Sequence, residues 1–258
     1  MRRSLLLCAA VLIATAASAA TFEGTFDRTF DVRPGTLFAL DNMNGRVIVR
    51  SWNEPRVRVR AVRRVTCRDS EEARKAFNAL SIVPTVTSDA LRIQTKAPRR
   101  DNGLFDWIAG TNVNINVDYD VTLPRTMDVE IDNTNGAIDL GDVHGSMRLS
   151  NTNGHIECAR CGGAIEAETT NGSIRADLAE LTRGKAVRLV TTNGGLTIAL
   201  PRSAGARIDA STTNGSIRTD LPVSTTEMRR NSLRGTINGG GGDVRLRTTN
   251  GSISIQAH

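Results

Sequence analysis

Apolar and polar residues alternate on both sides of seven Asn-Gly pairs, which begin at Asn44, Asn135, Asn153, Asn171, Asn193, Asn214 and Asn250. Side chains six and four residues before each Asn are apolar, and so are those three and five residues after it, with Thr219 as the one polar exception. Alternation with a period of two is typical of half-buried β-strands. Each Asn-Gly pair is therefore predicted to be a turn between two strands.

The turns are evenly spaced between residues 128 and 176. Glycines recur there every nine residues, and an Asn precedes every second one, so the full repeat is 18 residues long. Repeats of fixed length indicate solenoids, in which equivalent residues of successive coils stack about 4.8 Å apart. The pattern predicts an all-β protein, a β-helix-like solenoid of 18-residue coils, with the seven asparagines forming a structural turn ladder.

Asn-Gly is also the strongest short signal for a β-hairpin, because both residues tolerate positive φ. A β-meander of Asn-Gly hairpins is therefore the alternative fold. The near-constant repeat length favours the solenoid, because identical amides stacked in register share hydrogen bonds. One coil cannot bury its own apolar face, so several coils have to stack and the two ends need caps.

The chain before the regular repeats is more varied. Residues 69–80 are predicted to form one short helix, with Asp69 or Ser70 as its N-cap and one apolar stripe that consists of Ala73, Ala76, Phe77 and Leu80. Strands with alternating patterns surround this helix. We expect residues 20–123 to form a cap or side layer on a repeat solenoid of residues 124–258, within one continuous domain from 20 to 258.

Residues 1–19 have the character of a signal peptide. Arg2 and Arg3 precede an apolar run from Leu5 to Ala17, and small residues follow up to Ala19. We expect cleavage after Ala19 and export to the periplasm, the cell surface or the medium. No second apolar run approaches the roughly 20 residues of a membrane-spanning helix, so no transmembrane segment is expected in the mature chain.

Composition constrains the fold more than it constrains the function. Aromatic residues make up only 3% of the chain, so the core has to consist of Ile, Val, Leu and Ala. The net charge of +6 becomes +4 without Arg2 and Arg3, and charges of both signs are mixed along the chain. Such a balance does not indicate a nucleic-acid partner. No motif for a cofactor is present, and none is predicted.

The repeat units resemble a known family. Asn-Thr-Asn-Gly occurs at residues 133–136 and 151–154, and Thr-Thr-Asn-Gly-Ser-Ile at 169–174, 212–217 and 248–253. Together with the signal segment and the short helix, these units resemble the bacterial "putative adhesin" β-strand-repeat family, a domain of unknown function similar to the head GIN domain. The resemblance covers about residues 36–258. It implies a β-helix-like exported domain with an adhesive or envelope-associated role, and it supplies no catalytic residues.

Three cysteines remain after removal of Cys8 with the signal segment. Cys158 and Cys161 have the spacing of a redox motif, but no helix is predicted after them to activate a thiol. We expect a structural disulfide, either between Cys158 and Cys161 or between Cys158 and Cys67. A zinc site needs a second ligand pair, and no other pair has the spacing.

Acidic residues and histidines give no clear catalytic site. Asp118 and Asp120 alternate along one predicted strand, a pattern that is more typical of a solvated surface than of weak Ca²⁺ binding. The glycine repeat lacks the turn aspartates of calcium-binding β-rolls. His144 and His155 have no matching nucleophile and acid. No catalytic residue and no metal ligand is therefore predicted.

Two segments are candidates for a contact surface. Arg56, Arg58 and Arg60 alternate with apolar residues, which gives one strand a basic outer face. This face suits an anionic envelope polymer, or it protects an exposed sheet edge from aggregation. Phe105 and Trp107 lie in a predicted loop, where aromatic side chains would either anchor a partner or cap the open end of the coil.

These observations favour an exported, non-enzymatic β-repeat protein that contacts an unknown protein or polysaccharide of the cell envelope or surface. The alternative is a polysaccharide-active β-helix enzyme, a lyase or hydrolase. It would require a cleft that gathers Asp118, Asp120 and nearby arginines, and the low aromatic content argues against it. A third hypothesis is a thiol protein that uses Cys158 and Cys161. The sequence leaves the oligomeric state open.

Overall fold

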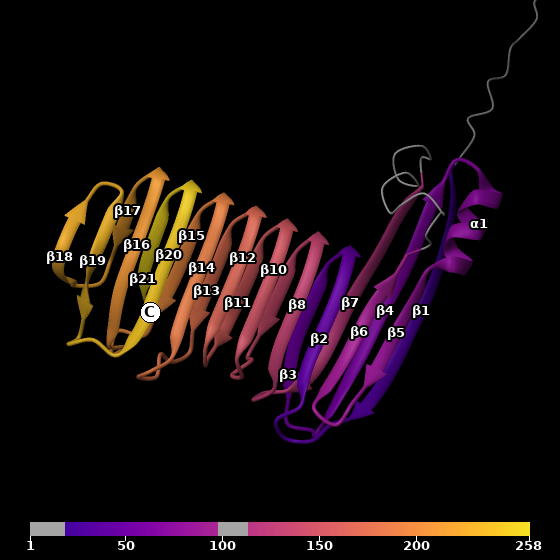
Figure 1. Cartoon of the computed structure of the whole chain (residues 1–258), viewed down its shortest axis with the longest axis horizontal. Helices are drawn as coiled ribbons and strands as arrows, with labels where there is room; N and C mark the ends of the chain where they lie inside the picture. The colour runs from indigo at the N-terminus through magenta and orange to yellow at the C-terminus, as the bar shows by residue number, and fades with distance from the viewer. Residues whose placement is uncertain (1–18, 98–112) are drawn as a thin grey trace, which may run out of the picture.

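The computed structural model describes residues 19–97 and 113–258, which form an elongated solenoid of two β-sheets (Figure 1). Sheet A, as we name it, has ten strands, and sheet B has eleven. The helix α1 (Ser70–Ala79) lies at the N-terminal end of the stack. Residues 1–18 of the predicted signal segment, and the candidate contact residues Phe105 and Trp107, lie outside the described residues. No helix within the described ranges is long and apolar enough to cross a membrane.

Each repeat coil places one strand in sheet B and the next in sheet A, with the Asn-Gly turn between them. The coils are β2 (Leu37–Asn44) with β3 (Val47–Trp52), β8 (Asp128–Asn135) with β9 (Ile138–Gly141), β10 (Met147–Asn153) with β11 (Ile156–Cys161), β12 (Ile165–Asn171) with β13 (Ile174–Leu178), β14 (Ala186–Asn193) with β15 (Leu196–Leu200), β16 (Ala206–Asn214) with β17 (Ile217–Thr219), and β20 (Gly242–Asn250) with β21 (Ile253–Ala257). Neighbouring coils pair in parallel, with Asn opposite Asn in the sheet B strands. The predicted β-solenoid is therefore confirmed, and the hairpin meander is wrong because hairpins would make these neighbours antiparallel.

The apolar positions of the repeat form one aliphatic column between the sheets. Ile138, Ile156 and Ile174 lie in register on β9, β11 and β13, and each is at most 1% exposed. Burial of such a side chain contributes about 1.5–3 kcal/mol relative to its exposure to water. Many stacked aliphatic side chains of this kind replace the aromatic core that the composition does not provide.

Glycine follows Asn in the turn because the coils approach too closely for a side chain. Gly154 has a φ of +142°, and a Cβ atom there would lie 2.0 Å from the carbonyl oxygen of Gly136 in the preceding coil. Gly172 stands in the same relation to Gly154, also at 2.0 Å. The Asn-Gly pair, which alone reads as a hairpin signal, therefore serves here to stack parallel turns.

The order of coils in space departs from the order in the chain at both ends. The last coil, β20 with β21, lies between the coil β14–β15 and the coil β16–β17 (Figure 1). At the other end, β2 and β3 lie between β6 (Ala90–Lys96) with β7 (Asn114–Pro124) and β8 with β9. Nothing in the repeat spacing marks this interleaving, because every Thr-Asn-Gly unit offers the same pairing surface.

Antiparallel strands cover the ends of the stack. The hairpin of β18 (Ser224–Arg229) and β19 (Ser232–Ile237) pairs with β16 at the C-terminal end of sheet B. At the N-terminal end, β1 (Ala20–Asp31) and β4 (Arg56–Cys67) extend sheet A beyond β7, and β5 (Ser81–Val86) extends sheet B beyond β6. Pro84 lies in the edge strand β5, where a missing N–H discourages further pairing.

The predicted short helix is present as α1. The carboxylate of Asp69 accepts hydrogen bonds from the backbone N–H groups of Glu71 and Glu72, at 2.8 and 3.1 Å, so Asp69 is the N-cap. The side chain of Phe77, in the same helix, packs against Phe22 of β1, with ring centroids 6.1 Å apart. The helix thus holds the outermost strand of sheet A to the rest of the N-terminal end.

Candidate functional site

The seven turn asparagines form one continuous amide ladder along the edge of the solenoid. Six of the seven side-chain amides donate to the Oδ1 atom of the Asn in the adjacent coil on the N-terminal side of the stack, at distances between 2.5 and 2.8 Å. In spatial order the ladder reads Asn44, Asn135, Asn153, Asn171, Asn193, Asn250 and Asn214. Because every rung bonds to its neighbours, this row serves the fold more than a ligand.

A second, buried ladder runs inside the first and was missed from the sequence. It occupies the position two residues before each turn Asn, and its side chains donate to backbone carbonyls of the neighbouring coil. Asn151 donates to the carbonyl of Gly136 at 2.8 Å, and Thr169 donates to that of Gly154 at 3.1 Å. The signal was present in the sequence, since Asn or Thr fills this position in all seven repeats.

A groove of about 490 Å³ lies on the outer face of sheet A, over β1, β4, β7 and β3. Asp118, Asp120, Arg46 and Arg60 line it, so the structure does bring the two aspartates together with arginines. The backbone N–H of Arg46 donates to Asp118 at 2.9 Å. This is the arrangement that the carbohydrate-active alternative requires.

Arginines neutralise both aspartates of the groove. Arg64 lies 3.8 Å from a carboxylate oxygen of Asp118, and Arg50 lies 3.3 Å from one of Asp120. Both carboxylates therefore already have a cationic partner within the protein. Groove residue Tyr119 turns its ring into the core and is only 2% exposed, so it offers no platform for a sugar.

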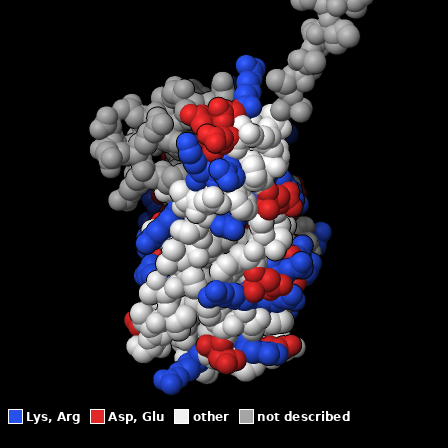
Figure 2. All heavy atoms as spheres, turned by 90° about the vertical axis from the view of Figure 1, so that its right-hand side faces the viewer, with Lys and Arg blue, Asp and Glu red and all other residues white. Residues whose placement is uncertain are grey.

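The predicted basic stripe is paired with acidic groups. Both nitrogens of the Arg58 fork bind Asp27 of β1, at 3.0 and 2.7 Å, and Arg60 lies 3.6 Å from the same carboxylate. The hydrogen bond from Arg58 lowers the pKa of Asp27 below its usual value. Arg56 pairs with Glu54. Figure 2 shows acidic and basic side chains side by side over this end of the molecule.

One interpretation of that stripe is wrong. The three arginines lie on β4, which pairs with β1 on one side and with β7 on the other, so this strand is not a sheet edge. Their charges therefore do not protect an exposed edge from aggregation. Arg58 and Arg60 pair instead with Asp27 of the neighbouring strand β1, and the sequence did not reveal this because Asp27 lies 31 residues before Arg58.

The cysteines fall into two places. Cys158 and Cys161 lie on the same strand, β11, and both residues are buried, and the Cys161 thiol donates to the backbone carbonyl of Ala159 at 3.7 Å. Four strand spacings separate Cys67 on β4 from β11, which is about 19 Å at 4.8 Å per strand. A disulfide needs Cα atoms within about 7 Å, so this geometry disfavours the pair Cys67–Cys158. The neighbouring Cys161 thiol and burial raise the pKa of the Cys158 thiol, which opposes a reactive thiolate at Cys158.

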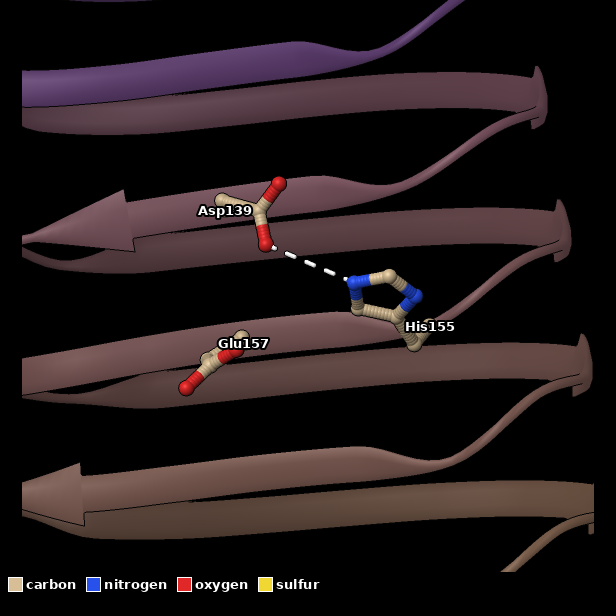
Figure 3. A group of neighbouring side chains, drawn as sticks. All are labelled: Asp139, His155 and Glu157. Carbon is tan, nitrogen blue, oxygen red and sulfur yellow. Dashed lines mark ion pairs between the residues drawn. The ribbon is translucent and has the colours of Figure 1, made fainter.

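Asp139, His155 and Glu157 meet on the outer face of sheet A (Figure 3). Asp139 on β9 and Glu157 on β11 are register partners, and His155 precedes β11 on the same face. The Nε2 atom of His155 lies 3.5 Å from an oxygen of Asp139. Sequence analysis did not group these residues, although the 18-residue repeat separates Asp139 from Glu157.

Comparison with known proteins places the chain in a family. The family model described as Toastrack DUF4097 matches residues 108–256. Among solved structures, a "putative cell adhesion protein" from Clostridium sporogenes ATCC 15579 is 16% identical, with a TM-score of 0.47 over 91% of this chain and 100% of the other. A "putative adhesin" from Bacteroides fragilis NCTC 9343 is 9% identical, with a TM-score of 0.39 over 91% of this chain and 97% of the other. No curated protein matches the sequence. The chain belongs to the Toastrack DUF4097 family, a family of unknown function that the sequence resemblance had indicated.

Proposed function

We propose that this protein is an exported, non-enzymatic interaction module that binds a protein or polysaccharide of the cell envelope or surface. Positions shared between coils are occupied by core residues, turn amides and close-packed glycines, which build the scaffold. Residues that vary from coil to coil point outward on the two sheets. Rigid scaffolds with variable outer side chains are typical of repeat proteins that bind extended partners.

The observation that carries this proposal is a row of alternating charges on sheet B. Glu130, Arg148, Glu166 and Arg188 lie in register on β8, β10, β12 and β14. Arg148 and Arg188 lie 3.1 and 3.9 Å from Glu166. A groove of about 440 Å³ runs beside the row, with the small residue Ala164 among those lining it.

This geometry suits an extended partner that lies across the strands. Neighbouring strands are about 4.8 Å apart, so the row presents a charge of alternating sign at each step. A polymer or an extended peptide in the groove would meet these groups in sequence. Partly exposed ion pairs contribute little to folding, so the groups can exchange partners at low cost.

Binding to fractionated cell envelope tests the proposal. The double variant Arg148→Glu with Arg188→Glu should lose most of the material that the unaltered protein retains, and binding should weaken as salt rises. Arg175→Glu with Arg218→Glu is the matched control, because these exposed arginines lie on sheet A. Failure of the unaltered protein to retain any envelope protein or polysaccharide would contradict the proposal, as would equal losses in both double variants.

The sheet A groove supports a second candidate, a polysaccharide-active enzyme. Its supporting observation is the presence of Asp118 and Asp120 with Arg46 and Arg60 in one groove. Release of reducing ends or of unsaturated sugars from envelope polysaccharides measures this activity. The second candidate requires product from the unaltered protein and its loss in the variant Asp120→Asn.

Export itself is also part of the proposal. The charged start, apolar run and small residues of positions 1–19 support it. Mass determination of the N-terminus after expression in a bacterium should find a mature chain that starts at Ala20. An uncleaved chain that stays with the cytoplasmic fraction would contradict this.

A further inference from the structure

The repeat length itself brings a mixed set of donor groups together. Because Asp139 and Glu157 are 18 residues apart, they occupy the same outward position in neighbouring coils. His155 lies two residues before Glu157, so it points to the same face of the sheet. The backbone carbonyl of His155 also accepts a hydrogen bond from the N–H of Ile138 at 3.0 Å, which fixes its place beside β9.

The spacing of the donor atoms fits a small divalent ion. One ligand atom from each of Asp139, His155 and Glu157 lies within 4.8 Å of the other two. Bonds of about 2.1 Å in a tetrahedral zinc site place the ligand atoms about 3.4 Å apart. The distance between His155 Nε2 and Asp139 Oδ1 is 3.5 Å, so these two need almost no movement. Glu157 is only partly buried and can turn toward them.

Arg46 holds one of the three proposed ligands, Asp139, in place through a hydrogen bond. Its Nε atom donates to Oδ2 of Asp139 at 2.6 Å and leaves Oδ1 directed toward His155. Carboxylates that bind metals are commonly held by such outer hydrogen bonds. The guanidinium also offsets the repulsion between Asp139 and Glu157, two like charges on adjacent strands.

We propose that Asp139, His155 and Glu157 form a binding site for a divalent transition-metal ion such as Zn²⁺, with one coordination position left open at the surface. The imidazole selects transition metals over Ca²⁺ and Mg²⁺, which prefer oxygen ligands alone. The open position would accept water or a donor group from a partner. This inference does not depend on the charge row of sheet B, which lies on the other sheet.

Calorimetric titration of ZnCl₂ into the purified, tag-free protein tests the site. One Zn²⁺ ion per chain is expected to bind, and CoCl₂ should give a visible absorption band from a bound cobalt ion. His155→Ala and Glu157→Gln should each weaken Zn²⁺ binding at least tenfold. His155 is exposed and Glu157 is only partly buried, so circular dichroism should show the fold of the unaltered protein.

His258→Ala is the matched control. His258 lies 3.3 Å from Asp177, so it also pairs with a carboxylate, but it belongs to no group of three ligands among the described residues. Its removal should leave Zn²⁺ binding unchanged. The proposal is overturned if no Zn²⁺ binds, if His258→Ala weakens binding as much as His155→Ala, or if Ca²⁺ binds equally well and His155→Ala has no effect.

Discussion

Asn250 donates its side-chain amide to Oδ1 of Asn193 across 2.8 Å, although 57 residues separate them in the chain. Asn214 in turn donates to Asn250 at 2.8 Å. The last repeat therefore lies inside the stack and pairs on both sides, whereas the repeat before it lies further out. Contacts between residues so distant in sequence stabilise the C-terminal end of the stack. They also slow folding, because a long loop has to close before they form.

Close stacking of the turns predicts a sharp difference between two glycines. Gly154→Ala would place a methyl group 2.0 Å from the Gly136 carbonyl, at a φ of +142°. We expect a loss of about 3 kcal/mol in the free energy of unfolding, from overpacking and backbone strain. Gly141→Ala is the control, because its Cβ would meet nothing within 4 Å. Denaturant unfolding measures both, and equal midpoints for the two variants would refute the close-packing argument.

The buried inner ladder predicts that substitution of two adjacent threonines changes the free energy of unfolding by different amounts. Thr169 donates to the Gly154 carbonyl, whereas Thr170 is exposed on the other face of the strand. Thr169→Val removes the donor and leaves a buried carbonyl with one partner fewer, so we expect a loss of about 1–2 kcal/mol. Thr170→Val should change stability by less than about 0.5 kcal/mol. The comparison uses urea unfolding, and a larger loss for Thr170→Val would contradict the assignment.

The cysteine geometry predicts one disulfide after export. In an oxidising compartment an oxidised dithiol protein takes two electrons and two protons from Cys158 and Cys161, and their sulfurs become bonded. Thiol alkylation followed by mass spectrometry should find these two linked and Cys67 free. Cys161→Ser should leave both Cys158 and Cys67 as free thiols. A bridge within one chain between Cys67 and either Cys158 or Cys161 would contradict the strand order of sheet A.

An ion-pair group around Asp142 predicts a dependence of stability on pH. A hydrogen bond from Arg160, with help from Arg125, lowers the pKa of Asp142 below its ordinary value of 3.8. Because the pKa is lower in the folded state, the stabilisation is present above 3.8 and is lost as the pH falls through the folded value. Asp142→Asn should therefore lower the melting temperature at neutral pH. The difference in melting temperature between the variant and the unaltered protein should shrink as the pH falls below 3.8.

Asparagine is the suitable replacement at this position because Asp142 has a φ of +58°, which Asn also tolerates. Asp132→Asn, an exposed carboxylate on β8, serves as the control and should show a smaller difference at neutral pH. A difference for Asp142→Asn that stays constant from neutral pH to strong acid would exclude the ion pair as its cause.

The sequence predicts the coil but not the order of coils. Alternation around each Asn-Gly pair predicts the strands and their buried faces, and the repeat length predicts that Asn171 stacks on Asn153. Asn193 could pair equally well with Asn214 or with Asn250, since both follow two threonines. Which of the two coils stacks on Asn193 depends on the connecting loops and on the hairpin at residues 224–237. The alternation of apolar and polar residues within a repeat does not encode that choice.

The candidate sites also differ in whether the sequence predicts them. The distance of 18 residues between Asp139 and Glu157 is visible in the sequence, and a search along the repeat would have joined them with His155. Arg58 and Asp27 could not be joined in this way, because β1 is not part of any repeat. Sites within the periodic region are thus predictable, whereas sites between periodic and irregular segments require the structure.

Interleaving at both ends also limits how such a protein can change in size. A duplicated unit added after residue 257 or before residue 37 would have no free edge to join, because those coils are already enclosed. Duplication among the coils from Asp128 to Leu200 meets no such obstacle, since each new unit would find an identical neighbour above and below. Longer or shorter relatives should therefore differ by whole units in the middle, while both termini keep their arrangement.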